Sequence, residues 1–233
     1  PSVCTDKSPW QGMYARDKYA RDRVMKSARL LLPYLKENET VVDIGCFTQE
    51  ARKYYPRDIK YIGLDEKAYH RETVVVDLNG EFEIPKAKAV LCLETLEHLL
   101  RPHHMLERIH TALGPDGHLV VSLPNEATVF HRLRCFFGTV DGECFADKGK
   151  HLHLPSLRQA RCLLVHGQHF EIQKELFYIS PTGFSSRQAW VGRILSLIPD
   201  RIHQTFADLL PSLFARGFIF LLKKKILPSS STL

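Results

Sequence analysis

The segment Glu94-Thr-Leu-Glu97-His98 places three chemically versatile side chains within about one helical turn. Two carboxylates and one imidazole form a donor set that could hold a divalent cation. An unperturbed imidazole also titrates near neutral pH, so His98 could equally accept a proton during a reaction. The segment follows the apolar run 88–93, which is typical of a buried strand.

A second chemical signature is the stretch 40–49, which reads TVVDIGCFTQ. Its apolar residues through Ile44 indicate a buried parallel strand. Asp43 followed by Gly45 marks the point where such a strand turns into a helix. Nucleotide cofactors bind at turns of this kind, so this turn is a candidate cofactor site.

Apolar runs alternate with helix-forming segments along the chain and must position these residues. We expect strands at 40–44, 60–65, 73–77, 88–93, 118–122, 170–179 and 216–222. We expect helices at 14–35, 50–55, 103–113, 128–137 and 156–166, a turn at 114–117, and a helical apolar face formed by Ile202, Phe206, Leu209, Leu210 and Leu213. Strands separated by short helices favour parallel pairing through right-handed crossovers.

We therefore predict an α/β fold: a Rossmann-like, mostly parallel seven-stranded sheet with helices on both faces and a small helical cap. The length of 233 residues suits one domain rather than two. We divide this domain into an N-terminal helical cap (1–36), a cofactor-binding half (37–123), a substrate-side half with cap insertions (124–225) and a flexible serine-rich tail (226–233).

The order of these features resembles that of class I, Rossmann-like S-adenosylmethionine (SAM)-dependent methyltransferases. Their first motif is written Asp-x-Gly-x-Gly-x-Gly, and this chain has Phe47 and Gln49 at the second and third glycine positions. The resemblance continues through acids after the second and third strands, the segment 93–98 with Pro102, and the turn 114–117 that leads to Leu123-Pro-Asn125.

The resemblance implies that SAM is the cofactor and S-adenosylhomocysteine (SAH) the product. Asp65 would accept hydrogen bonds from the ribose hydroxyls, and the segment around Asp77 would contact the adenine. The implied cofactor-binding residues are Asp43, Gly45, Cys46, Phe47, Gln49, Asp65, Asp77, Leu78 and Glu94. Because the sulfonium already activates the methyl group, the protein chiefly aligns an attacking atom and removes its proton. His98 and His151 are our catalytic candidates for that base.

A subset of this family acts with a metal and has similar residues followed by a later histidine. It includes ubiquinone-pathway O-methyltransferases and small-RNA 2′-O-methyltransferases. Resemblance to this subset gives the candidate metal ligands Glu94, Glu97, His98 and His153, with His151 as the other choice for the later ligand. The alternative, which we favour, uses no metal: Glu94 contacts the methionine amine of the cofactor, and His98 is structural or faces the substrate.

The leading functional hypothesis is methyl transfer to an oxygen or nitrogen of a small-molecule, glycan or lipid-linked acceptor. A catalytically silent binding or pairing module is the alternative, because bulky residues at glycine positions could narrow the cofactor pocket. Retention of Asp43, Asp65 and Asp77 favours cofactor binding, since a mere scaffold does not need these acids. An RNA 2′-O-methyltransferase is the third hypothesis, although no aromatic stacking pattern accompanies the basic residues.

Composition limits the remaining possibilities. The chain is 44% hydrophobic and 25% charged, as in soluble globular proteins, and no run of about 18 apolar residues predicts a membrane span. Six cysteines without paired spacing and no visible signal peptide predict reduced thiols and a cytoplasmic location. The formal charge of +6 permits an anionic partner. The amphipathic segment 190–206 could contact a membrane surface or a second copy in a homodimer, but packing on the core is the expectation.

Overall fold

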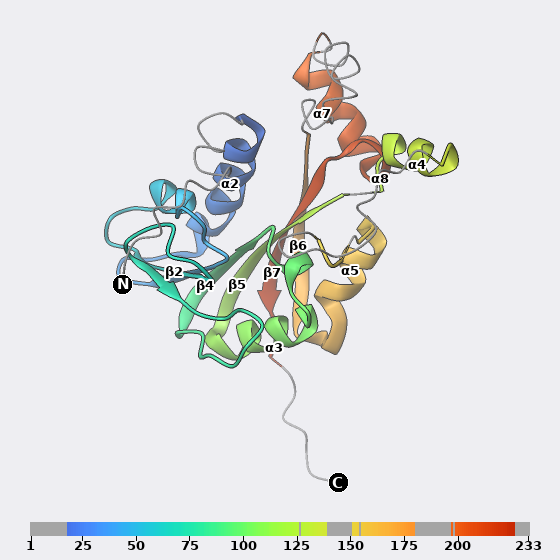
Figure 1. Ribbon diagram of the computed structural model, residues 1–233. Coiled ribbons are helices and arrows are strands. Elements are labelled where there is room, and N and C mark those ends of the chain that lie inside the picture. The colour runs from blue at the N-terminus through green and yellow to red at the C-terminus, as the bar shows by residue number, and fades with distance from the viewer. Residues whose placement is uncertain are drawn as a thin grey trace.

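A computed structural model describes residues 18–125, 127–138, 151–153, 155–179, 197 and 199–226 (Figure 1). Its strands form one seven-stranded sheet in the order β3-β2-β1-β4-β5-β7-β6. Their bounds are β1 Thr40–Ile44, β2 Lys60–Asp65, β3 Thr73–Val75, β4 Ala87–Leu93, β5 Leu113–Pro124, β6 Phe170–Tyr178 and β7 Gly217–Lys224. Strands β1 to β5 pair in parallel, and β7 lies antiparallel between β5 and β6. The predicted Rossmann-like, mostly parallel sheet is confirmed.

Helices cover both faces of this sheet. The α-helices are α2 Lys18–Leu31, α3 Pro102–Ala112, α4 Val129–Phe136, α5 Leu157–Val165, α7 Asp200–Leu209 and α8 Pro211–Phe214. The short 3₁₀ helices are η1 Leu32–Tyr34, η2 Glu50–Tyr54, η3 Leu96–His98 and η4 His166–Gln168. In Figure 1, α2 lies on one side of the sheet, and α3 and α5 lie on the other.

Helix α2 packs on the core through one face. Val24, Ala28 and Leu31 recur at helical spacing and are buried. They belong to a hydrophobic cluster that includes Val41 of β1 and Val120 of β5. On the opposite face, α3 and α5 bury Met105, Leu106, Ile109, Leu157, Ala160 and Leu164 in a second cluster. The two clusters hold the sheet between the helices and so fix the strand ends that carry the candidate site.

Several predicted elements differ in detail from the observed ones. No helix occurs in the connections 66–72 and 76–86, which link β2 to β3 and β3 to β4. Strand β3 stops at Val75 instead of Asp77, and the Asp77 carboxylate accepts a hydrogen bond from the Asn79 amide at 2.9 Å. The predicted turn at 114–117 is a bulge within β5, where Ala87 and Ala89 pair with Leu113 and His118.

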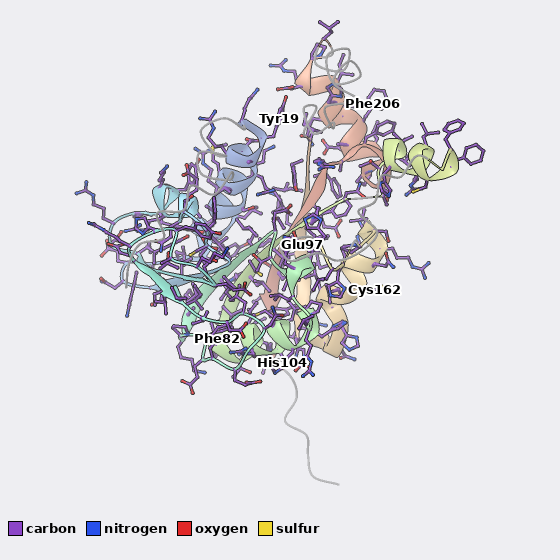
Figure 2. The ribbon with its side chains drawn as sticks, viewed as in Figure 1. Tyr19, Phe82, Glu97, His104, Cys162 and Phe206 are labelled. Atoms are coloured by element: carbon purple, nitrogen blue, oxygen red, sulfur yellow. The ribbon has the colours of Figure 1, made fainter. Side chains whose placement is uncertain are left out.

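The expectation that the apolar segment 190–206 packs on the core falls mostly on residues that the structure does not describe, and the apolar side chains described on α7 are largely exposed. Ile202, Phe206 and Leu209 are 47%, 49% and 71% exposed, and Ala207 is the one residue of α7 that is buried. Helical periodicity reports that one face is apolar, but it does not say what that face contacts. Figure 2 shows Phe206 on a helix that projects away from Glu97 at the centre of the molecule.

Some predictions fall on residues that the structure does not describe. These are the parts of the predicted caps at 1–17, 139–150 and 180–196, the tail from 227, and Cys4 and Cys144. The four described cysteines, Cys46, Cys92, Cys135 and Cys162, are free thiols. Among the described residues, no helix combines the length and apolar character needed to cross a membrane.

Candidate functional site

The turn after β1 is built around Gly45. Its φ of 73° is left-handed, and a Cβ at this position would lie 2.2 Å from the Thr95 hydroxyl oxygen. The Thr95 hydroxyl in turn donates to the Ile44 carbonyl at 3.2 Å. The amides of Gly45 and Cys46 both donate to the Leu64 carbonyl, at 2.8 and 3.1 Å. Glycine is therefore required here both for its backbone conformation and for the close approach of Thr95.

The two residues at the family's later glycine positions retain a glycine-like backbone. Phe47 and Gln49 have φ values of 45° and 56°, in the left-handed region that glycine favours. The Gln49 side chain is buried and donates through Nε2 to the Thr73 hydroxyl at 3.2 Å. A Cβ on Gly63 would lie 2.6 Å from this Nε2, so the glycine in β2 makes room for the amide. The substitutions thus leave the backbone conformation of the turn in place.

Asp65, at the end of β2, is tied to the same turn. Its Oδ2 accepts the Phe47 amide at 2.8 Å, and its Oδ1 accepts the Lys67 amide at 3.2 Å. Burial raises the pKa of Asp65, while the hydrogen bond from the Phe47 amide opposes that rise. The Phe47 ring lies beside Tyr69, with 4.5 Å between ring centroids. The acid is therefore oriented toward the turn by the turn's own backbone.

Asp43 is an interior acid. It is 4% exposed and accepts a hydrogen bond from the Tyr61 hydroxyl of the neighbouring strand. Burial raises its pKa to about 7, the Tyr61 hydrogen bond opposes this, and the negative charge of Asp65 adds to it. Burial also raises the pKa of the Cys46 thiol, which lies 3.8 Å from the Thr73 hydroxyl. Asp43 is thus buried within β1, and Cys46 is buried in the turn that follows it.

The loop after β3 carries Asp77, Leu78 and Asn79. Asp77 is exposed to solvent, whereas Leu78 is buried. Asn79 accepts the Leu100 amide at 2.8 Å, which joins this loop to the segment before α3. An exposed acid therefore lies next to an apolar residue at the position where the sequence predicts adenine contacts.

Glu94 is held by three elements at the end of β4. Its Oε1 accepts hydrogen bonds from the Ser122 hydroxyl of β5 at 2.9 Å and from the Tyr178 hydroxyl of β6 at 3.3 Å. Its Oε2 lies 3.3 Å from Arg23 Nη1 of α2. A Cβ on Gly217 of β7 would lie 2.2 Å from the Tyr178 hydroxyl, so the glycine allows this packing. Arg23, Ser122 and Tyr178 were not predicted from the sequence, because each reaches the site from a distant element.

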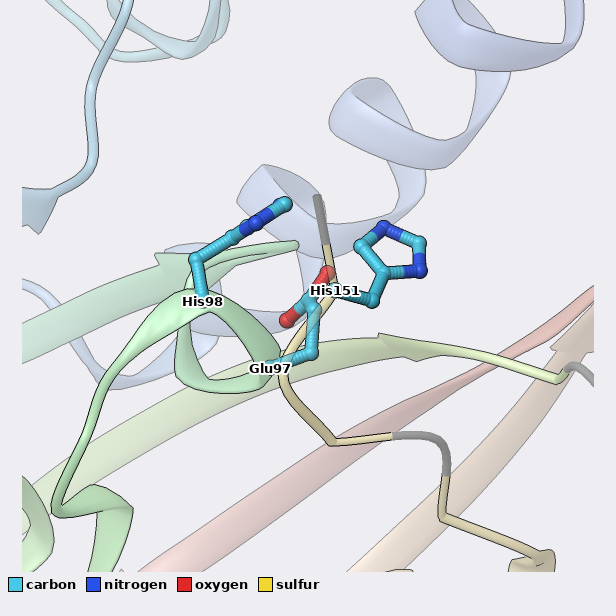
Figure 3. Close-up of side chains that lie close together, drawn as sticks. All are labelled: Glu97, His98 and His151. Atoms are coloured by element: carbon cyan, nitrogen blue, oxygen red, sulfur yellow. The ribbon is translucent and has the colours of Figure 1, made fainter. Parts of the chain in front are cut away.

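Glu97, His98 and His151 lie together, although 53 residues separate the two histidines in sequence (Figure 3). One ligand atom from each lies within 4.8 Å of the others. The two imidazole rings meet edge to face, with 4.8 Å between centroids. Glu97 is 1% exposed, and both of its carboxylate oxygens are shielded from solvent.

Backbone hydrogen bonds hold His151 in this position. The Glu97 carbonyl accepts the amides of Leu152 and His153 at 2.8 and 3.1 Å. The His153 ring nitrogen Nε2 is 2.9 Å from the Leu99 carbonyl. These hydrogen bonds attach the segment 151–153 to η3 and to the residue that follows it. They place His151 beside His98, while the His153 ring faces the Leu99 carbonyl.

The grouping differs from the predicted metal ligand set of Glu94, Glu97, His98 and His153. His151 takes the place of His153, and Glu94 contacts Arg23, Ser122 and Tyr178 instead. The prediction assumed one continuous helical turn from Glu94 to His98. Glu94 instead has a left-handed φ of 50°, and η3 begins only at Leu96. Glu94 and Glu97 consequently belong to separate groups of contacts.

A family model described as a methyltransferase domain matches residues 15–175. The chain belongs to this family. Together with the sheet order, this membership makes the protein a class I, Rossmann-like SAM-dependent methyltransferase, as the sequence predicts. A search of curated proteins finds no significant match.

Solved methyltransferases share the fold at low sequence identity. A SAM-dependent methyltransferase from Archaeoglobus fulgidus aligns over 94% of this chain and 100% of its own, with 17% identity and a TM-score of 0.59. The N-methyltransferase NodS from Bradyrhizobium japonicum, solved with SAH, aligns over 95% and 94%, with 12% identity and a TM-score of 0.59. The small RNA methyltransferase HEN1 aligns over 91% of this chain and 26% of its own, with 16% identity and a TM-score of 0.57.

Replacing Gly45 with alanine tests the packing of the turn in this methyltransferase. Gly45→Ala should lower the free energy of unfolding by about 2–5 kcal/mol, because left-handed strain adds to overlap with Thr95. Gly138 is a matched control: its φ is 63°, but a Cβ there would meet nothing within 4 Å. Gly138→Ala should lower the free energy of unfolding only by the cost of the left-handed backbone, about 1–2 kcal/mol. Urea denaturation measures both, and equal losses would contradict the close approach of Thr95.

Proposed function

We propose that this methyltransferase moves the methyl group of SAM to an oxygen or nitrogen of a small-molecule, glycan or lipid-linked acceptor. The observation that carries the proposal is the meeting of His98 and His151, with ring centroids 4.8 Å apart, just after the carboxyl end of β4. An imidazole can take the proton that the acceptor loses, and a neighbouring imidazole can hold the acceptor or relay that proton.

Residues at the carboxyl ends of β1 to β4 fit the cofactor. The backbone of 45–49 would approach it, Asp65 would face the ribose, Asp77 and Leu78 the adenine, and Glu94 the methionine amine. When bound, SAM supplies a methyl group already activated by the positive sulfonium. Asp65 and Glu94 place two carboxylates at the ends of β2 and β4, which suits a cationic ligand. The left-handed backbone at Phe47 and Gln49 favours a working cofactor turn over a silent module.

Binding of SAH distinguishes an enzyme from a silent module without knowledge of the acceptor. We expect calorimetric heat and a rise in melting temperature with SAH or SAM. Asp65→Asn should weaken binding about tenfold or more, because it removes a charged acceptor that also positions the turn. Asp58→Asn, a change of the same chemistry in an exposed turn, should leave binding unchanged. Absence of heat and of a thermal shift at millimolar ligand would leave only the scaffold function.

The proposed proton transfer predicts a specific loss of turnover. His98→Ala and His151→Ala should each lower kcat by about 10²-fold or more while SAH affinity is retained. His104→Ala, a half-buried histidine of α3, is the control and should keep normal turnover. Release of SAH in the presence of hydroxyl, phenolic and amine acceptors reports the rate. Unchanged turnover in both variants would remove these histidines from the mechanism.

A divalent cation at Glu97, His98 and His151 is the second candidate, because three ligand atoms lie within 4.8 Å of one another. A carboxylate with two imidazoles is a donor set typical of Zn²⁺ or Mn²⁺. In this version the ion would orient the acceptor and lower the pKa of its hydroxyl. The alternative of an RNA 2′-O-methyltransferase is related to this metal-dependent candidate, because the small RNA methyltransferase HEN1 shares the fold. Strongly salt-dependent RNA binding would favour this alternative.

Metal titration separates this second candidate from the metal-free reaction. If the ion binds, Glu97→Gln should weaken Zn²⁺ affinity about tenfold or more, as expected for loss of a charged ligand. Glu94→Gln is the matched control, because Glu94 lies on the same segment but outside the cluster. Calorimetry with Zn²⁺ or Mn²⁺ and elemental analysis of the purified protein provide the measurements. No stoichiometric ion and no heat would exclude the metal.

A further inference from the structure

A group of exposed apolar side chains is carried by α4, α7 and α8 at one corner of the fold. We call it the corner surface, and its members are Leu133, Phe136, Phe137, Ile202, Phe206, Leu209, Leu210 and Phe214. Phe136 and Phe137 are 82% and 69% exposed, which is extreme for two adjacent phenylalanines. Single exposed apolar residues are ordinary, but a group of this kind marks an interaction site.

Asn125 brings these helices to one corner. It follows β5 directly and is fully buried. Its side-chain Nδ2 donates to the carbonyls of Pro211 and Ala215 at 3.2 and 2.8 Å, at either end of α8. Its Oδ1 accepts the Ala127 amide at 3.0 Å, just before α4 begins. One buried amide therefore fixes α8 and the start of α4 together, and Figure 1 shows α4 and α8 side by side beneath α7.

Within the part of the chain that the structure describes, basic residues outnumber acidic ones on α4, α7 and α8. Helix α4 contains two arginines and no acid. In the segment 199–216, Arg201 and Arg216 balance Asp200 and Asp208, but Asp200 is already paired with Lys18 at 2.9 Å. Exposed phenylalanines on a helix that carries arginines and no acid are the composition that binds at the interface of an anionic bilayer. A two-fold contact between copies would instead bring these like charges together.

The corner surface adjoins the candidate site. Asn125 is three residues beyond Ser122, which contacts Glu94, and the Arg216 amide donates to the Tyr178 carbonyl at 2.8 Å. The base of the corner surface and the candidate site therefore lie at the same end of the sheet. We propose that the corner surface docks this protein on an anionic lipid bilayer through Phe136 and Phe137. The bilayer would then present a lipid-linked acceptor to His98 and His151, a consequence that rests on the proposed function.

Vesicle flotation tests the docking directly. The full chain should float with vesicles that contain about one third phosphatidylserine in phosphatidylcholine, and much less with phosphatidylcholine alone. High salt should reduce the floated fraction by screening the arginines. The double substitution Phe136→Ser and Phe137→Ser should weaken partitioning roughly tenfold or more, because two aromatic anchors are lost. Arg201→Gln should weaken binding to the anionic vesicles and not to the neutral ones.

A matched control separates this surface from general stickiness. Leu100 is 70% exposed and precedes α3, away from the corner surface, so Leu100→Ser should float like the unmodified chain. Melting temperature and SAH binding, measured on the same samples, show whether each variant is folded and whether the proposed function fails separately. The proposal is overturned if the unmodified chain does not float, if the double variant floats equally, or if sedimentation shows a dimer that the double variant dissociates.

Discussion

The contact between Gly45 and Thr95 is the constraint on which the candidate site depends. It joins the end of β1 to the end of β4, because the Thr95 hydroxyl reaches the Ile44 carbonyl across the space that a glycine side chain leaves empty. Thr95 lies between Glu94 and η3, so its position also decides where the following acids and histidine go. Glu94 turns toward α2, β5 and β6, while Glu97 and His98 turn toward the segment 151–153.

Three acids near the ends of β1, β2 and β4 differ in their burial and in the groups that compensate their charge. Asp43 is fully enclosed, and its pKa of about 7 shows that burial outweighs the hydrogen bond from Tyr61. Asp65 is less enclosed, and backbone amides of the neighbouring turn offset part of its desolvation. Glu94 is neutralised in part by Arg23. A positively charged ligand beside Asp65 and Glu94 would be attracted by both carboxylates.

The sequence predicts the sheet well because its signals are local. Apolar runs placed β1, β2 and β4 within a residue of their observed bounds, since buried parallel strands read as continuous apolar segments. The same signals could not show that His151 and not His153 meets His98, because this depends on two amides bonding one carbonyl of η3. Tyr178 lies 84 residues from Glu94 and was invisible to motif reasoning. Helical periodicity predicted the apolar face of α7 but could not say what that face contacts.

Among the described residues, three of the five non-glycine residues with a left-handed φ lie at the ends of β1 and β4; the other two are Asn38 and Gln168. Phe47, Gln49 and Glu94 have left-handed backbones without being glycine, at a cost of about 1–2 kcal/mol each. Each is held by a bond to a neighbouring strand or its end: the Phe47 amide to Asp65, the Gln49 amide group to Thr73, and the Glu94 amide to the Ser122 carbonyl. A structure selected for stability alone would relieve such strain with glycine. Strain on the two adjoining turns after β1 and β4 therefore indicates that the backbone geometry there is needed for something besides stability. Ligand binding is a function that requires such fixed geometry.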